Sequence, residues 1–393
     1  MYGPEFADDL AEFYRRTRSE RGSVTPVLLV GDVPAWLVLS YRELLHVCRN
    51  PQVFSRNSAH WNLWPQVPQD WPLSVPLMPL PGVLNTEGDE HRRRAGALSD
   101  VMEDVDRVDL ARMCERTADQ LIDSFAGDGK ADLIAQYTQQ MTPAVIARLV
   151  GFPEDLIPAL NADLILLATS VADAVTSGMR VMETIGAFVT GQRKEPGPGL
   201  VGKLMRHPAG LTDEELTLDV SIIFGTGPQL TANWIGSALR LMLIDDEFSL
   251  SLQGGRSSVD QALNEVLWHD PPAHSMIGRW PLEDVTLGGH RIPKGDFIVV
   301  SMAAANADAR LRLEAGASVN RAHVSFGHGE HSCPVGAPEV AEVIATTAVE
   351  VLLDRLPDIH LAVGPDDLRW NESTWLRSLE SLPVTFAPVA AYR

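Results

Sequence analysis

Helical spacing of apolar residues dominates the sequence and runs from His91 to about Gly191. Glycine-containing breaks near Gly127–Gly129 and Gly151–Pro153 divide this region into successive helices. Another long apolar helix follows the capping box Thr212–Glu215, whose side chains satisfy free amides at a helix start. This pattern predicts a mainly α-helical protein.

The rest of the sequence predicts a minority of β-structure. Alternating apolar residues on both sides of Gly31-Asp32 predict a two-stranded hairpin. Short strand-like pieces recur after Asp270 in DVTLGGHRIP and DFIVVSMA. No internal repeat and no break in composition occurs, so we expect a single domain over residues 1–393, mainly α with smaller β-sheets.

Composition and charge argue against several protein classes. The 393 residues are 45% hydrophobic and 21% charged, as in a globular protein, and contain no long apolar run. The N-terminal residues are polar, so we expect a cytoplasmic protein without a membrane span. A net charge of -20 opposes nucleic-acid binding, which needs a broad basic face. Cys48 and Cys114 lie on apparent helices, where we expect them to be buried and inert.

The stretch FGHGEHSCPVG, Phe326–Gly336, crowds three glycines, two histidines and a cysteine into one loop before a long helical segment. Such residues are ordinary in loops, so a purely structural loop is one interpretation. Zinc binding is less favoured because paired ligand spacing is absent. A phosphate loop is also less favoured, because no lysine, serine or threonine follows the final glycine.

A haem-thiolate site fits the same loop better. A flat haem must approach the backbone closely, which favours Gly327, Gly329 and Gly336. Cys333 precedes a helix start, where free amides and the helix dipole stabilise a thiolate. Thiolate ligation promotes O–O cleavage by haem iron, and His331 is within reach of a haem propionate.

The loop resembles the haem-binding signature of the cytochrome P-450 superfamily, F-G-x-G-x-H-x-C-x-G, at Phe326, Gly327, Gly329, His331 and Cys333. The resemblance extends over nearly the whole chain through the first hairpin, GDEHRRRAGAL, LTANWIG and the segment from HDPPAH to VVSMAAAN. It implies the cytochrome P-450 fold, with haem b held between the oxygen-binding helix and the Cys-loop helix. Cys333 is then the iron ligand, and Phe326 and His331 contact the haem.

The resemblance also implies ligands for the haem propionates. His91 matches the histidine of the family's D-P-P-E-H-x-R helix, and Arg279 in RWPLEDV matches the arginine of R-x-A-x-x-D. The family's arginine four residues after the histidine is Ala95 here, so Arg94 is a candidate substitute. The other interpretation of the run HRRR is a solvated basic face, which would also orient an acidic ferredoxin.

The oxygen-binding helix departs from the family pattern A-G-x-Asp/Glu-Thr-Thr. Gln229 replaces the acid and cannot titrate, and Leu230 replaces the first threonine. The usual proton delivery to dioxygen is therefore in doubt, and Thr231, water or a substrate group is left to supply protons. Gly227, beside Pro228, predicts a kink next to the substrate.

Two further departures concern the proximal side. Cys333-Pro334-Val335-Gly336 is one residue longer than the family's Cys-x-Gly, and proline removes an amide that could bond to sulfur. The family's Glu-x-x-Arg pair appears as Glu265 and Trp268, so Glu265 needs another partner. Either Trp268 simply packs or the core is rebuilt around the missing arginine.

Three functions stay open. The resemblance implies a monomeric haem enzyme that receives electrons from ferredoxin and ferredoxin reductase. Oxidative C–C or C–N coupling of an aromatic intermediate, such as a tryptophan-containing cyclic dipeptide, is favoured by the lost acid–alcohol pair. The proline-rich loop at residues 55–85 also favours coupling, because Trp61, Trp64 and Trp71 predict an aromatic pocket wall, although core packing explains them too. The alternatives are ordinary monooxygenation in secondary metabolism and a haem-binding accessory protein without turnover.

Overall fold

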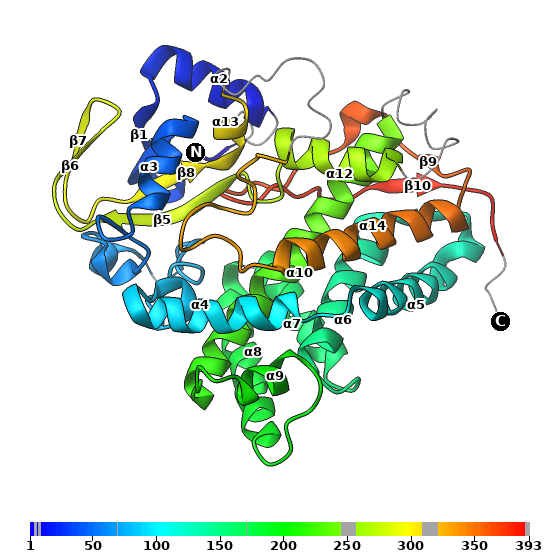
Figure 1. Cartoon of the computed structure of the whole chain (residues 1–393). Coiled ribbons are helices and arrows are strands. Elements are labelled where there is room, and N and C mark those ends of the chain that lie inside the picture. The colour runs from blue at the N-terminus through cyan, green and yellow to red at the C-terminus, as the bar shows by residue number, and fades with distance from the viewer. Residues whose placement is uncertain are drawn as a thin grey trace.

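The computed structural model describes residues 1–3, 6, 9–68, 70–169, 171–244, 257–308 and 321–389. Its helices gather mainly on one side, while the largest sheet and three shorter helices form the other side (Figure 1). The helices are α2 (Leu10–Arg21), α3 (Tyr41–Arg49), α4 (Gly88–Glu103), α5 (Arg107–Phe125), α6 (Gln139–Val150), α7 (Ile157–Thr169), α8 (Val171–Gln192), α9 (Leu200–Arg206), α10 (Asp213–Ile244), α12 (Ser257–His269), α13 (Met302–Asn306) and α14 (Ala337–Arg355). The predicted mainly α class with smaller sheets is confirmed, and the single-domain organisation stays a prediction.

The strands form three sheets. The largest has the order β1-β2-β8-β5-β3, and the others have the orders β4-β10-β9 and β6-β7. The strands are β1 (Val24–Leu29), β2 (Val33–Val38), β3 (Phe54–Ser55), β4 (Lys130–Asp132), β5 (Ser275–Pro281), β6 (Val285–Leu287), β7 (His290–Ile292), β8 (Ile298–Ser301), β9 (His360–Leu361) and β10 (Pro383–Thr385).

The predicted hairpin around Gly31-Asp32 is confirmed. Strands β1 and β2 pair antiparallel from Val24↔Val38 to Leu29↔Val33. Gly31 and Asp32 both have positive φ, at 74° and 57°, which suits a tight hairpin connection. The hairpin joins the centre of the sheet because β2 pairs parallel with β8.

The predicted capping box at the start of α10 is also confirmed. The Thr212 backbone N–H donates to Glu215 Oε2 at 2.9 Å, and the Glu215 N–H donates to Thr212 Oγ1 at 3.2 Å. Helix α10 then continues without interruption through Pro228. Because proline has no N–H, one bond of the helical ladder is missing there, but the helix does not break.

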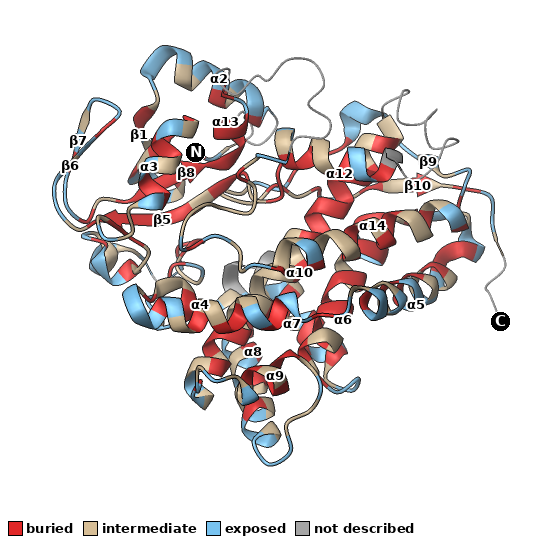
Figure 2. Ribbon diagram, viewed as in Figure 1, coloured by how far each residue is buried: buried red, intermediate tan, exposed pale blue. Residues whose placement is uncertain are grey.

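Buried residues concentrate where the helices face one another (Figure 2). The largest apolar cluster is built around the long helix α10. Most of its other members come from the helices α4 through α9, from α12 and from α14. A second cluster lies on the sheet side, between the hairpin, α2 and the segment at residues 61–77. Cys48 and Cys114 are 1% and 0% exposed, as expected. Within the described ranges, no helix combines the length and apolarity needed to cross a bilayer.

Candidate functional site

Backbone hydrogen bonds fold the loop around Cys333 into a tight turn before α14. The Cys333 N–H donates to the Phe326 carbonyl at 2.8 Å, and the Ser332 N–H donates to the Gly329 carbonyl at 3.0 Å. Gly329 has a φ of 77°, and a Cβ there would lie 2.3 Å from the Cys48 carbonyl oxygen. Glycine is therefore required at this position both by backbone conformation and by space.

The extra residue after Cys333 forms an exposed bulge against the C-terminal end of α4. Val335 is 59% exposed, and its N–H donates to Ser99 Oγ at 3.1 Å. Gly336 has a φ of 82°, and a Cβ there would lie 2.6 Å from the Glu103 nitrogen. The longer Cys-Pro-Val-Gly segment thus docks on α4 before α14 begins.

Burial dominates the electrostatics of the half-buried Cys333 thiol. It raises the pKa of Cys333 to about 12, and the negative charge of Glu339 adds to the shift. Burial thus opposes the stabilisation of a thiolate that we expect from the helix start, and the haem-thiolate role of Cys333 stays a prediction. A metal ion that takes the place of the proton is the usual means of ionising such a thiol.

Four basic side chains gather beside this loop. Strands β3 and β5 pair antiparallel with Ser55 opposite Trp280, which places Arg56 and Arg279 near each other. His331 in the loop and His91 in α4 have ring centroids only 3.9 Å apart. Sequence reasoning found three of these residues but missed Arg56.

Most polar atoms of this basic cluster, Arg56, Arg279, His91 and His331, are buried without a partner. Arg279 is 1% exposed, and none of its three side-chain nitrogens has a hydrogen-bond partner. The same holds for both ring nitrogens of His331 and for Nε of Arg56. The nearby Cys48 thiol interacts with Arg279 both through charge and as a side-chain hydrogen-bond acceptor, but sulfur is a weak acceptor. Buried orphan donors of this kind call for a missing partner.

The pKa shifts in the basic cluster show the same lack of counter-charge. Burial lowers the pKa of Arg279, and it lowers that of Arg56 to about 9, with repulsion from Arg279 adding to the shift. Burial and then the charges of Arg279, His91 and Arg56 lower the pKa of His331 to about 2. An anionic ligand would reverse these shifts by supplying opposite charge.

The residues around Cys333 therefore fit haem b. The thiol provides a soft ligand for iron, while Gly327 and Gly329, where a Cβ would meet Ser332 and Cys48, fix the tight turn that presents it. The unpaired donors of Arg279 and His331 suit the propionate carboxylates. Phe326 lies at the edge of this site, with its ring 5.9 Å from the Trp234 ring of α10 in a T-shaped contact.

His91 joins α4 to the Cys333 loop. Its Nδ1 lies 2.9 Å from the Val83 carbonyl oxygen, and its Nε2 lies 2.9 Å from the Glu330 carbonyl oxygen. Both ring nitrogens thus face backbone carbonyls. Its predicted contact with a propionate stays a prediction.

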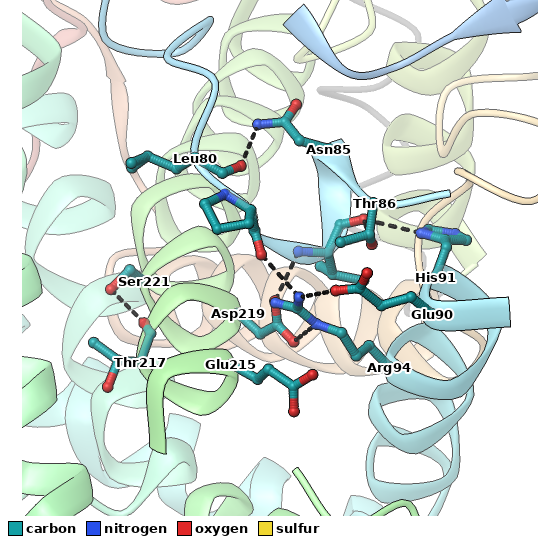
Figure 3. Close-up of polar contacts among 12 residues, drawn as sticks. Leu80, Asn85, Thr86, Glu90, His91, Arg94, Glu215, Thr217, Asp219 and Ser221 are labelled. Atoms are coloured by element: carbon teal, nitrogen blue, oxygen red, sulfur yellow. Dashed lines mark hydrogen bonds and ion pairs between the residues drawn. The ribbon is translucent and has the colours of Figure 1, made fainter. Parts of the chain in front are cut away.

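Arg94 has a full set of partners, in contrast to Arg279 (Figure 3). Its Nε donates to Asp219 Oδ2 at 2.9 Å and its Nη2 to Asp219 Oδ1 at 2.5 Å. Its Nη1 donates to the Pro81 carbonyl at 2.8 Å and to Glu90 at 3.1 Å. Burial lowers and Asp219 raises the pKa of Arg94, and the balance is a raised pKa. The structure favours a link between α4 and α10 over the predicted propionate contact.

The run HRRR does not form the expected solvated basic face. His91 and Arg94 are buried, and Arg93 is half-buried against Glu215 of α10 and the Ala209 carbonyl. Only Arg92 is exposed, and it pairs with Asp89 at 2.6 Å and Glu330 at 3.4 Å. The expectation fails because one helix turn directs most of the run inward.

In the segment of α10 that the resemblance assigns to oxygen binding, the polar side chains already have hydrogen-bond partners within the helix. Gln229 Nε2 donates to Asn233 Oδ1 at 2.8 Å, and the buried Thr231 hydroxyl donates to the Gly227 carbonyl at 2.8 Å. Leu230 between them is half-buried. None of these five residues has a titratable side chain, while the Thr231 oxygen still has lone pairs that can accept a hydrogen bond.

The tryptophans of the proline-rich loop belong to the sheet-side cluster. Trp61 and Trp71 are 2% and 4% exposed, and Trp61 lies 5.6 Å from Trp71 and 4.9 Å from Phe297 between ring centroids. Trp64 is half-buried, 5.8 Å from Trp61. Gly227 and Thr231 lie on α10, around which the other cluster is built. The structure thus favours core packing for these rings over the predicted pocket wall.

Glu265 finds its partner within its own helix. His269 Nε2 lies 3.2 Å from Glu265 Oε2, one helical turn further along α12. Trp268 packs its ring edge-on against His323 at 5.8 Å. The packing interpretation of Trp268 is therefore supported, and residues 309–320, which include most of the segment after α13, lie outside the described residues.

Within the described ranges, neither a cluster of metal ligands nor the cavity on the sheet side includes Cys333. No three His, Cys, Asp or Glu side chains in these ranges converge as a metal-binding group. A cavity of about 360 Å³ lies along β1 and β2, lined among others by Leu28, Trp36 and Asp296. It contains none of the predicted site residues.

No family model matches the chain, but relatives cover most of it. It is 32% identical over 285 residues to the polyketide biosynthesis cytochrome P-450 PksS of Bacillus subtilis, covering 70% of each protein. It is 30% identical over 407 residues to the cytochrome P-450 monooxygenase PikC of Streptomyces venezuelae, covering 97% of this chain and 92% of that protein.

Solved structures resemble the whole chain. The structure of PksS matches with a TM-score of 0.85 and 27% identity over 98% of both chains. Myxobacterial cytochrome P-450 CYP267B1, solved in complex with myristic acid, matches with a TM-score of 0.84 and 26% identity over 98% of both chains.

Proposed function

The chain belongs to the cytochrome P-450 family, and from this premise we propose what it oxidises and with which residues. It is a haem b oxidoreductase whose relatives include monooxygenases of secondary metabolism. Thiolate-ligated haem supplies the redox chemistry that activates dioxygen. We propose Cys333 as the iron ligand and Arg279 and His331 as propionate contacts, because these groups have the matching chemistry and no other partner.

We propose that the reaction is an oxidative coupling of an aromatic natural-product intermediate. The substrate loses two hydrogen atoms, one new C–C or C–N bond forms, and no oxygen is inserted. Dioxygen is the oxidant: two electrons come from the substrate and two from ferredoxin through its reductase. With two added protons, both oxygen atoms leave as water, so atoms and electrons balance.

The observation that carries this proposal is the polar chemistry of α10. Gln229 is tied to Asn233, and Leu230 has neither donor nor acceptor. A substrate with its own N–H groups, such as a tryptophan-containing cyclic dipeptide, would offset the lack of an acid–alcohol pair. Thr231 can orient such a group, because its hydroxyl oxygen accepts a hydrogen bond while it donates to Gly227.

Hydroxylation is the second candidate, and the names of the relatives favour it. PikC is a monooxygenase, and the chain spans nearly all of it. On this alternative, water ordered by Thr231 supplies the protons that the missing acid would relay. A haem-binding accessory role is disfavoured, because the relatives that cover the whole chain are enzymes.

Product mass distinguishes the two reactions. The purified enzyme is first screened for compounds that shift its haem absorption spectrum. Each compound that does so is then incubated with the enzyme, ferredoxin, reductase and ¹⁸O₂, and the mass of the product is measured. Coupling predicts a product two hydrogens lighter without label. A product that gains one ¹⁸O atom would instead establish hydroxylation. As a check on the site, Cys333→Ala should lose the thiolate-type Soret band of the reduced carbon monoxide complex.

A further inference from the structure

The structure contains a second guanidinium beside Arg279 that sequence reasoning did not find, that of the half-buried Arg56, whose Nε atom is buried. Arg56 follows β3 directly, and the pairing of β3 with β5 brings it to the basic cluster. Strand β5 bulges between Met276 and Arg279, where Gly278 has a φ of 87°. The bulge turns the Ile277 and Gly278 carbonyls toward Arg56 Nη1, which donates to both, to Gly278 at 2.8 Å.

These two bonds position Arg56 but do not neutralise it. Its Nε is buried without a partner, and no ion pair joins Arg56 or Arg279 to a carboxylate within the described residues. Glu87, whose Oε1 accepts a hydrogen bond from Ser55, exerts a coulombic effect on Arg279 but makes no ion pair with it. Two like charges are thus held close together with no carboxylate paired to either of them in the described part of the chain, an arrangement that is costly unless an anion joins them.

We propose that Arg56 binds a haem propionate, and so replaces the arginine that the family pattern carries where this chain has Ala95. The guanidinium groups of Arg56 and Arg279 match the two carboxylates of haem b, with His331 beside them. Arg94, the other candidate for this role, has every nitrogen engaged by Asp219, Pro81 and Glu90. The inference concerns the cofactor alone and holds for coupling or hydroxylation equally.

Haem loss from the holoenzyme tests the proposal without any substrate. The readout is the rate of haem transfer to an excess of apomyoglobin, for the wild type and for Arg56→Gln. A lost charge-assisted hydrogen bond predicts about tenfold to hundredfold faster transfer. Arg56→Lys keeps the positive charge but lacks the planar pair of N–H donors of a guanidinium. Its rate of haem transfer should lie between those of the wild type and Arg56→Gln. Arg92→Gln, at an exposed arginine near the same face, is the matched control and should leave the rate unchanged.

A cofactor cycle separates a propionate contact from a merely structural role. Wild type and Arg56→Gln are each loaded with haem and with haem dimethyl ester, whose propionates carry no charge. The proposal predicts that the substitution accelerates loss of haem but not of the ester. Equal acceleration of both cofactors, or no acceleration of either, would overturn it. If Arg56→Gln does not fold, the same cycle is run with Arg56→Lys and judged by the same two outcomes.

Discussion

Arg94 and Arg279 are equally buried, each 1% exposed, but their surroundings are opposite. Asp219 and two further acceptors engage all three nitrogens of Arg94. Arg279 has Arg56 beside it, and the weak sulfur acceptor of Cys48 is the only group that offsets the lack of oxygen or nitrogen partners for its three nitrogens among the described residues. The difference teaches that a buried arginine with partners belongs to the architecture, whereas one without partners marks the place of a ligand.

Removing the acid of the satisfied pair should have the largest effect. Asp219→Asn leaves the buried Arg94 charge with only the more exposed Glu90 as counter-charge, so we expect up to about 3–5 kcal/mol less stability. The loss should be similar with and without haem, because the hydrogen bonds of Asp219 go to Arg94 and to the Val83 N–H and not to the basic cluster. Denaturant unfolding of both forms measures it. Replacing Arg94 and Asp219 together by Met and Leu should cost much less, and an equal cost would contradict the ion-pair argument.

Removing the unsatisfied arginine should have opposite effects on the two forms. Arg279→Gln relieves an uncompensated charge, so the haem-free chain should be at least as stable as the wild type. The holoenzyme should lose about 1.5–3 kcal/mol of cofactor affinity, seen as faster haem transfer. Thermal unfolding of the haem-free chain measures the expected gain or unchanged stability, and haem-transfer kinetics measure the expected loss of cofactor affinity. Equal destabilisation of both forms would make Arg279 an architectural residue like Arg94.

The pH dependence of the haem-free chain gives a smaller test. The pKa of Arg56 is lowered from 12.5 to about 9, so the folded chain releases its proton earlier than the unfolded chain. The unfolded state then binds more protons above pH 9, and stability rises with pH in that window. We expect the stability difference between wild type and Arg56→Gln to shrink from pH 8 to pH 10. A difference independent of pH would argue against a buried charge.

The smallest effect is expected at the exposed member of the HRRR run. Arg92 pairs with Asp89 and Glu330 at the surface, where such pairs contribute about 0–1 kcal/mol. Arg92→Gln should therefore change neither haem retention nor unfolding beyond that range. A large loss in either measurement would show that exposure is a poor guide to the role of this helix.

Local patterns in the sequence predicted local structure well. The hairpin, the capping box and the tight loop before α14 depend on turn chemistry within a few residues, which a sequence displays directly. The partner of Glu265 was also within reach, because His269 stands at the i+4 position of the same helix.

Long-range contacts were not predictable in the same way. Arg56 becomes a neighbour of Arg279 only through the pairing of two strands far apart in the sequence. The same limit applies to Trp61 and Trp71, because large aromatic rings suit a core as well as a pocket wall. The sequence made Arg94 a candidate haem ligand, because its ion pair with Asp219 joins two different helices and is not visible in the sequence.

The bulge at Gly278 makes the site depend on the length of a strand as well as on its residues. Side chains alternate between the two faces of a strand, so deleting one bulge residue turns each following side chain over. The indole of Trp280 would then stand where the Arg279 guanidinium now meets the basic cluster, with no point mutation at either residue. Insertions and deletions in β5 are therefore expected to impair haem binding far more than substitutions of exposed residues outside the strand.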